Sequence, residues 1–352
     1  MKGICDMKIT FRWYGENDSI SLQKIRQIPC ISDITTAVYK SVGTVWEQDE
    51  IQRLKNECNK NGLSMEVIES IPVHEDIKLG KGKYKDYIEI FKENIRRVSK
   101  AGVKCVCYNF MPVFDWTRSN LEWINADGST SLVYHKEDVD KMDPTKMTLP
   151  GWDSSYTPAE MDELIREYMD LGEEGLWKNL EYFIKEIMPV AIECDVNMAI
   201  HPDDPPWSIF GIPRIITNEA NIDRFLSLYN DKHNGLTLCS GSLGCTSSND
   251  YVAMVKKYTK MGRVHFAHIR NVRISEDGSF EETAHYSPCG SLDIVEILKA
   301  YYDNGFDGYI RPDHGRMIWG ETGKPGYGLY DRALGAMYIA GIWESLEKFD
   351  KI

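Results

Sequence analysis

Residues 197–206 read Asn197-Met198-Ala199-Ile200-His201-Pro202-Asp203-Asp204-Pro205-Pro206, a short apolar run that ends in acidic residues and prolines. Runs of this kind recur along the chain and alternate with longer amphipathic segments, which is the pattern of repeated strand–helix units in a parallel sheet. The predicted strands are residues 9–13, 35–39, 64–69, 103–110, 197–201, 236–239, 264–269 and 308–311. This number of units predicts an α/β fold, the (β/α)₈ or TIM barrel.

The segments between the predicted strands carry helical patterns, at residues 49–61, 84–100, 218–229, 249–261 and 292–303. Thr157-Pro158-Ala159-Glu160 combines an N-cap, a proline in the first turn and a capping-box glutamate, so another helix is expected to start there. Residues 328–349 are apolar at helical spacing and are expected to form the final helix. No linker divides the sequence, and residues 1–352 are predicted to form a single barrel domain.

One connection is much longer than a barrel requires. Residues 111–156, after the fourth predicted strand, contain Trp116, Trp123, Tyr134 and Trp152 among small and polar residues, without a sustained helical or strand period. Long connections in compact domains are usually functional or disordered, and the aromatic content favours order. We therefore expect this enlarged loop to cover the mouth of the barrel.

Composition and charge exclude several classes of protein. The formal net charge is −13, which disfavours binding to nucleic acid through phosphate contacts. No stretch approaches the ~18 consecutive apolar residues that span a bilayer, and residues 1–6 lack the apolar region of a signal peptide. The 9 cysteines show no CxxC pair and fit reduced thiols. The expected protein is cytoplasmic and binds neither membrane nor nucleic acid.

In a parallel barrel the active site forms at the carboxyl ends of the strands. His201, Cys239, His268 and Asp313 stand within two residues of the ends of four successive predicted strands, the fifth to the eighth. Side chains at these positions can converge on one point, and two imidazoles, a thiolate and a carboxylate suit Mn²⁺, Fe²⁺ or Zn²⁺ better than Mg²⁺ or Ca²⁺. Strand pleating sends His265 and His268 to opposite faces, and His268, nearer the strand end, is the better candidate ligand.

Other residues of the strands do not point to one particular role. Cys105 and Cys107 share one face of the fourth predicted strand without an obvious histidine partner, so core packing is favoured over catalysis. Trp13 and Tyr14, at the end of the first strand, fit a sugar pocket and simple packing equally well.

The strand ends resemble those of the mannonate dehydratases from about residue 11 to the final helix. The matching strings are Phe11-Arg12-Trp13-Tyr14-Gly15, Glu69-Ser70-Ile71-Pro72-Val73-His74-Glu75-Asp76, Cys107-Tyr108-Asn109-Phe110-Met111-Pro112, His201-Pro202-Asp203-Asp204-Pro205-Pro206 and Arg311-Pro312-Asp313-His314-Gly315-Arg316. These strings are long and contain rare residue types, so the match is specific. Residues 111–196 look shorter than in the longer members of the family.

The resemblance implies a barrel of the xylose-isomerase group, a divalent metal, usually Mn²⁺ or alternatively Fe²⁺, and conversion of D-mannonate to 2-keto-3-deoxy-D-gluconate and water in hexuronate breakdown. It supports metal-ligand roles for His201, Cys239, His268 and Asp313. It implies catalytic roles for His314 and for Tyr327 of the Pro325-Gly326-Tyr327 string. Trp13, His74, Asn109 and Arg311, all within the matching strings, are candidate substrate-binding residues.

Several alternatives stay open at this point. A sugar isomerase on the same metal-binding barrel is the nearest rival, although such sites are commonly richer in carboxylates. A metal-dependent DNA-repair nuclease is disfavoured by the net charge. A non-catalytic sugar-binding or metal-binding module is disfavoured by the clustering of titratable groups. The expected partner is a small sugar acid, and a homodimer is one option for the assembly.

Overall fold

The computed structural model describes residues 7–146 and 156–350, in which eight parallel strands close into a barrel. Around the barrel the strands follow the order β1-β12-β9-β8-β7-β4-β3-β2. Their bounds are β1 Lys8–Arg12, β2 Asp33–Thr36, β3 Ser64–Glu69, β4 Cys105–Tyr108, β7 Asn197–Ile200, β8 Asn234–Cys239, β9 Val264–Ile269 and β12 Tyr309–Pro312. All eight predicted strands are therefore confirmed, and the fold is the predicted (β/α)₈ barrel.

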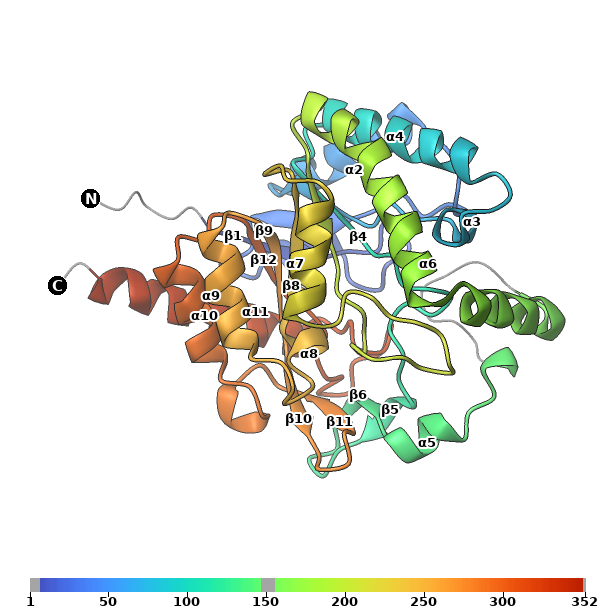
Figure 1. Cartoon of the computed structure of the whole chain (residues 1–352). Coiled ribbons are helices and arrows are strands. Elements are labelled where there is room, and N and C mark those ends of the chain that lie inside the picture. The colour runs from blue at the N-terminus through green and yellow to red at the C-terminus, as the bar shows by residue number, and fades with distance from the viewer. Residues whose placement is uncertain (1–6, 147–155, 351–352) are drawn as a thin grey trace.

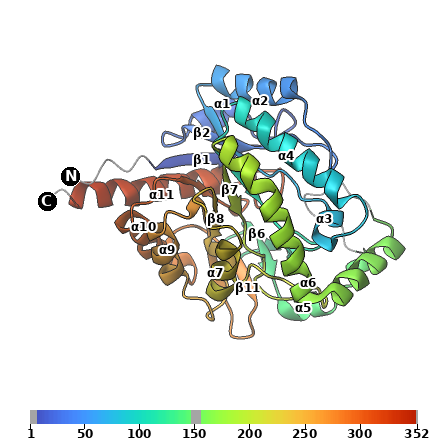
Figure 2. The ribbon, with the colours of Figure 1, turned by 45° about the horizontal axis from the view of Figure 1, so that its top comes forward.

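Helices pack around the outside of the barrel (Figure 1). The larger ones are α2 (Gln48–Lys60), α4 (Tyr84–Lys100), α6 (Pro158–Glu193), α7 (Glu219–Leu228), α9 (Tyr251–Lys260), α10 (Ile294–Asp303) and α11 (Tyr330–Phe349), which confirms the predicted helices. Two short helices, α1 (Leu22–Arg26) and α3 (Glu75–Leu79), complete the connections after β1 and β3. In Figure 2, α11 lies beside α10 and extends away from the barrel.

The start of α6 follows from its sequence. The Thr157 side chain accepts a hydrogen bond from the Glu160 backbone N–H, and the Glu160 side chain accepts one from the Thr157 backbone, as in a capping box. The helix then breaks at Gly172, whose φ of 66° suits glycine alone, so α6 consists of two segments that run in different directions (Figure 1).

The alternation of side chains along the strands separates two cores. Residues that point inward fill the barrel, among them Cys105, Cys107, Ala199 and Phe266, whereas the other face of each strand packs against the helices. Both cysteines are buried, in agreement with the packing interpretation, although Cys107 also reaches the floor of a cavity. His265 points outward as predicted, with its Nε2 2.8 Å from the Lys232 carbonyl oxygen.

A second sheet was not predicted. Residues 111–156 contain β5 (Asn120–Ile124), β6 (Thr130–Tyr134) and α5 (Lys136–Asp140), and β9 is followed by the hairpin β10 (Asn271–Ile274) and β11 (Phe280–Thr283). Together they form a four-stranded sheet in the order β10-β11-β6-β5, with antiparallel pairs, at one end of the barrel (Figure 1). Four- and five-residue strands are too short to show a clear period, although Asp277-Gly278 marks the β10–β11 turn.

Residues 147–155 of the predicted loop, with Trp152, lie outside the described residues. Among the helices described, none is both long and apolar enough to cross a membrane.

Candidate active site

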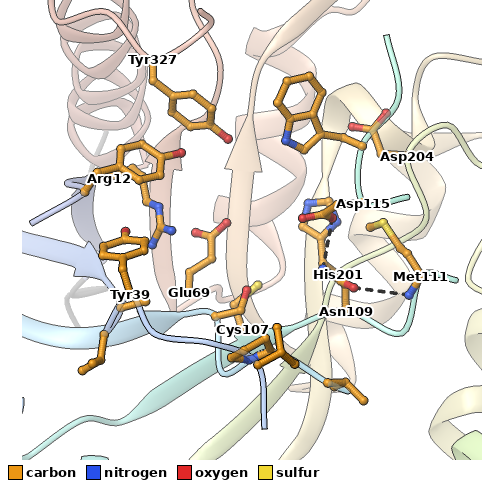
Figure 3. A pocket seen from close by; sticks show the side chains of 18 of the residues that line it. Arg12, Tyr39, Glu69, Cys107, Asn109, Met111, Asp115, His201, Asp204 and Tyr327 are labelled. Atoms are coloured by element: carbon orange, nitrogen blue, oxygen red, sulfur yellow. Dashed lines mark hydrogen bonds between the residues drawn. The ribbon is translucent and has the colours of Figure 1, made fainter. Parts of the chain in front are cut away.

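A cavity of about 600 Å³ opens at the carboxyl ends of the barrel strands. Side chains from β1, β3, β4 and β12, and from the segments that follow β1, β2, β3, β4, β7 and β12, line it (Figure 3). The lining includes Arg12, Tyr14, Glu69, His74, Asn109, Asp115, Trp116, His201, Arg311, Asp313, His314, Lys324 and Tyr327. The lining is rich in charged and titratable groups, as expected of a catalytic site rather than a packed barrel end.

The four predicted metal ligands converge. One donor atom each of His201, Cys239 and His268 lies within 4.8 Å of the others. Asp313 Oδ2 is 3.5 Å from Cys239 Sγ, and Asp313 Oδ1 is 3.9 Å from His268 Nδ1. His201 Nδ1 is 2.7 Å from the Pro202 carbonyl oxygen, which keeps a proton on Nδ1 and leaves Nε2 to act as a ligand.

The electrostatics of this cluster fit a cation. Burial raises the pKa of the Cys239 thiol, but the Arg270 guanidinium and the hydrogen bonds with His201 and His268 outweigh burial and lower it to about 6. Burial lowers the pKa of the His201 imidazole, but its hydrogen bond with Cys239 and the negative charges of Cys239 and Asp313 raise it to about 9. A thiolate therefore forms readily at neutral pH, as a metal ligand requires.

A buried nitrogen without a hydrogen-bond partner supports a ligand role for this cluster. His268 Nε2 is buried and has no hydrogen-bond partner among the described residues. Glu69 Oε2, 3.5 Å away, likewise has none, while Glu69 Oε1 accepts a hydrogen bond of 3.0 Å from Arg311. Buried polar atoms rarely stay unpaired. The donor set of two imidazoles, one thiolate and one carboxylate therefore fits a divalent transition metal.

Glu69 was not predicted as a site residue, although it stands in one of the matching strings. Its donor atom, with those of Cys107 and His268, forms a second group within 4.8 Å. Arg311 and His268 hold the pKa of the Glu69 carboxyl far below its usual range despite burial, so it is ionised. Figure 3 shows its carboxylate pointing into the cavity, on the side toward Tyr327.

His314 and Tyr327 lie together, as the predicted catalytic pair requires. His314 Nε2 is 2.8 Å from Tyr327 Oη, and both side chains are buried at the cavity wall. Burial raises the pKa of the Tyr327 hydroxyl well above its usual value, so it carries its proton at neutral pH. Trp116, from the enlarged loop, places its ring 5.4 Å from the His314 ring.

Three of the four candidate substrate-binding residues line the cavity. His74 Nδ1 accepts a hydrogen bond from the Asp76 backbone N–H, at 3.0 Å, so its Nε2 carries the proton and can donate. Asn109 donates to Asp115 Oδ1 at 3.1 Å, and Arg311 pairs with Asp313 Oδ1 at 2.7 Å.

The position of Trp13 does not support its predicted role in substrate binding. Its side chain is buried in the core between the barrel and the helices and does not line the cavity. The strand alternation instead turns its neighbours Arg12 and Tyr14 into the cavity. The two-residue period of strand one predicts this arrangement, because it puts Arg12 and Tyr14 on one face and Trp13 on the other.

Two further groups of charged side chains at the cavity were not predicted. Arg12 and Lys324 give one side of the cavity a positive charge, and Arg12 Nη1 is buried without a hydrogen-bond partner among the described residues. Behind His314, the buried side chains Arg118, Asp204, Arg270 and Glu282 form an ion-pair network. Arg118 and Glu282 come from outside the barrel strands, which is why no strand-end signal marks them.

Comparisons with known proteins agree with this arrangement. The family model of D-mannonate dehydratase (UxuA) matches residues 7–352. "Mannonate dehydratase 2" of Halalkalibacterium halodurans is 52% identical, with 97% of this chain and 99% of the relative covered. The crystal structure of mannonate dehydratase from Streptococcus suis superposes with a TM-score of 0.91 at 49% identity, over 96% of this chain and 94% of that one.

More distant neighbours share the fold alone. A xylose isomerase-like TIM barrel protein from Mycobacterium smegmatis has a TM-score of 0.53 at 13% identity, over 92% of this chain and 87% of that one. The xylose-isomerase-like barrel is therefore confirmed. Because the family model spans nearly the whole sequence and a relative of that name is 52% identical, the chain belongs to the D-mannonate dehydratase family.

Proposed function

We propose that this chain removes water from D-mannonate and forms 2-keto-3-deoxy-D-gluconate. The observation that carries the proposal is that four metal-ligand candidates converge in a family member, and that two of them, His201 and Asp313, line the same cavity as the His314–Tyr327 pair. The cations Arg12 and Lys324 in the same cavity favour an anionic substrate such as an aldonate.

His201, Cys239, His268 and Asp313 are the proposed ligands of a divalent ion, Mn²⁺ or Fe²⁺. Such an ion, when bound, stabilises negative charge on the substrate's carboxylate and C2 oxygen. The Arg311 guanidinium pairs with both Glu69 and Asp313 and so fixes the orientation of this wall of the cavity. We propose that Arg311, His74 and Asn109 contact the substrate.

The reaction breaks the C2–H and C3–O bonds of the substrate, and the resulting enol takes up a proton at C3 to become the ketone. One group must accept the C2 proton and another must protonate the departing hydroxyl. We propose His314 and Tyr327 for these roles, because both are buried at the cavity wall and share a hydrogen bond of 2.8 Å. A proton can pass between them along that bond.

Product analysis tests the function. Protein stripped of metal and refilled with Mn²⁺ is expected to convert D-mannonate, within a panel of aldonates, to a keto-deoxy acid lighter by one water. Mass spectrometry of the product is the measurement. Formation of a product of unchanged mass would contradict the proposal and identify an isomerase, and binding without turnover would identify a non-catalytic module.

We further propose that residues 111–156 cover the barrel mouth and help to exclude water. Met111, Val113, Asp115, Trp116 and Tyr156 of this segment line the cavity. Limited proteolysis is expected to cut the segment more slowly when Mn²⁺ and D-mannonate are present, because closure over a ligand protects a loop. Cleavage at other loops, scored by mass spectrometry in the same digest, is the control. Equal cleavage with and without ligands would show that the segment does not close over the substrate.

We propose, as the family resemblance implies, that the reaction belongs to hexuronate breakdown and takes place in the cytoplasm. The remaining choice between Mn²⁺ and Fe²⁺ can be made by refilling the stripped protein with each ion and comparing kcat on D-mannonate.

A further inference from the structure

The carboxylate of Glu282 reaches the proposed catalytic pair from outside the barrel strands. Glu282 lies on β11, and its Oε2 and Oε1 are 2.9 and 3.0 Å from His314 Nδ1. The other ring nitrogen, Nε2, is the one 2.8 Å from Tyr327 Oη. A carboxylate that binds one imidazole nitrogen fixes the orientation of the ring and the chemistry of the other nitrogen.

Two arginines hold this carboxylate in place. Arg118 donates to Glu282 Oε1 through Nε at 3.0 Å and Nη2 at 2.7 Å, and Arg270 Nη1 donates to the same oxygen at 2.7 Å. Both guanidiniums also pair with Asp204. The four side chains are buried, and their two positive and two negative charges balance. His314, Arg270 and Arg118 outweigh burial and lower the pKa of Glu282 to about 2, so it is ionised.

A donor and an acceptor both approach His314 Nδ1, and their balance bears on which ring nitrogen carries the proton. Arg270 Nη1 lies 2.7 Å from His314 Nδ1, and a guanidinium can only donate, whereas a carboxylate can only accept. Arg270 Nη1 already donates to Glu282 Oε1, but both Glu282 oxygens face Nδ1. A lone pair on Nδ1 would be repelled by the ionised carboxylate. The geometry therefore favours a proton on Nδ1 and a free lone pair on Nε2, facing the Tyr327 hydroxyl.

We infer that Glu282 is a positioning residue for the reaction, which holds His314 with a proton on Nδ1 and with Nε2 turned toward Tyr327. The kinetic consequence rests on the proposed function. The small sheet then does more than cover the barrel, because β11 supplies Glu282 and the segment before β5 supplies Arg118. In this arrangement the active site is complete only when the four-stranded sheet is assembled against the barrel.

The kinetic test replaces the carboxylate. Glu282→Gln is expected to lower kcat for D-mannonate about tenfold or more, with KM changed by less than about threefold and metal content unchanged, because the amide no longer imposes one tautomer. Glu281→Gln is the matched control: this neighbour pairs with His135 at 3.5 Å and is partly exposed, so kcat should stay at the wild-type value. A normal kcat in Glu282→Gln would overturn the inference.

Glu282→Gln leaves a buried guanidinium charge unbalanced and can destabilise the protein, so a double-mutant cycle separates positioning from folding. If Glu282 acts through His314, adding Glu282→Gln to His314→Asn should cause no further loss of kcat. A second, independent tenfold loss in the double variant would overturn the inference.

A measurement on the wild-type chain needs no turnover. Protein with ¹⁵N-labelled histidine and diamagnetic Zn²⁺ is expected to show a slowly exchanging proton on His314 Nδ1, assigned by its loss in His314→Asn; the chain has 8 histidines to resolve. A proton on Nε2 with a bare Nδ1 would overturn the inference. If wild-type protein leaves D-mannonate unchanged, the proposed function fails while this signal still tests the role of Glu282.

Discussion

Tyr327→Phe is expected to lower kcat for D-mannonate by about 10²-fold or more while metal content and folding stay unchanged. The substitution removes only the oxygen that lies 2.8 Å from His314 Nε2. The ring keeps its edge contacts with Tyr14 and His314, whose centroids are 5.1 and 4.8 Å away, so little packing is lost. Steady-state kinetics with elemental analysis of the same preparation would measure the effect.

Tyr338→Phe is a matched control for the loss of a phenolic oxygen. Tyr338 lies on α11 and also makes a side-chain hydrogen bond, 3.2 Å to Ser287 Oγ, but it does not line the cavity. Its kcat should equal that of the wild type. If Tyr327→Phe also retains a kcat near the wild-type value, Tyr327 has no part in proton transfer.

His314→Asn is expected to behave like Tyr327→Phe, since it removes the other member of the pair. The nearest oxygen of Asp313 is 4.0 Å from His314 Nε2, so the metal content should not depend on this imidazole. Loss of metal from His314→Asn would recast the residue as a ligand or as the support of one.

The barrel and the ligand candidates could be predicted because both depend on local signals. Each strand is a short apolar run, and each of His201, Cys239, His268 and Asp313 stands within one residue of the end of such a run. A parallel barrel brings all strand ends to one face, so positions 201 and 313, distant in sequence, meet without any long-range information. The pleat then distinguished His268 from His265 and, had it been applied to strand one, would have placed Arg12 rather than Trp13 in the cavity.

The ion-pair network behind His314 depends on contacts that no local pattern encodes. Arg118 and Glu282 are 164 residues apart, in two connections that pair only as strands of the second sheet. Neither connection has a period long enough to reveal its strands, and a lone glutamate or arginine in such a segment resembles an ordinary surface charge. Only the folded chain shows that these charges are buried against the proposed catalytic histidine.

Cys239→Ser is expected to lose most of its activity together with most of its bound metal. The serine hydroxyl stays protonated at neutral pH, whereas the surroundings of Cys239 lower the pKa of its thiol to about 6, so the substitution replaces an anionic sulfur ligand with a neutral oxygen. Addition of Mn²⁺ should also raise the melting temperature of the wild-type protein more than that of the variant, because a ligand stabilises the native state according to its affinity.

Cys245→Ser separates loss of a ligand from loss of a buried thiol. Cys245 is also buried, six residues further along the chain, but its Sγ donates to the Ser242 carbonyl oxygen at 3.0 Å, a bond that a serine hydroxyl can replace. This control should retain metal and turnover. If Cys239→Ser instead shows full metal content with normal turnover, Cys239 is not a ligand. Glu69, Cys107 and His268, a second group of converging donors that shares His268 with the first, would then be the next candidate site among the described residues.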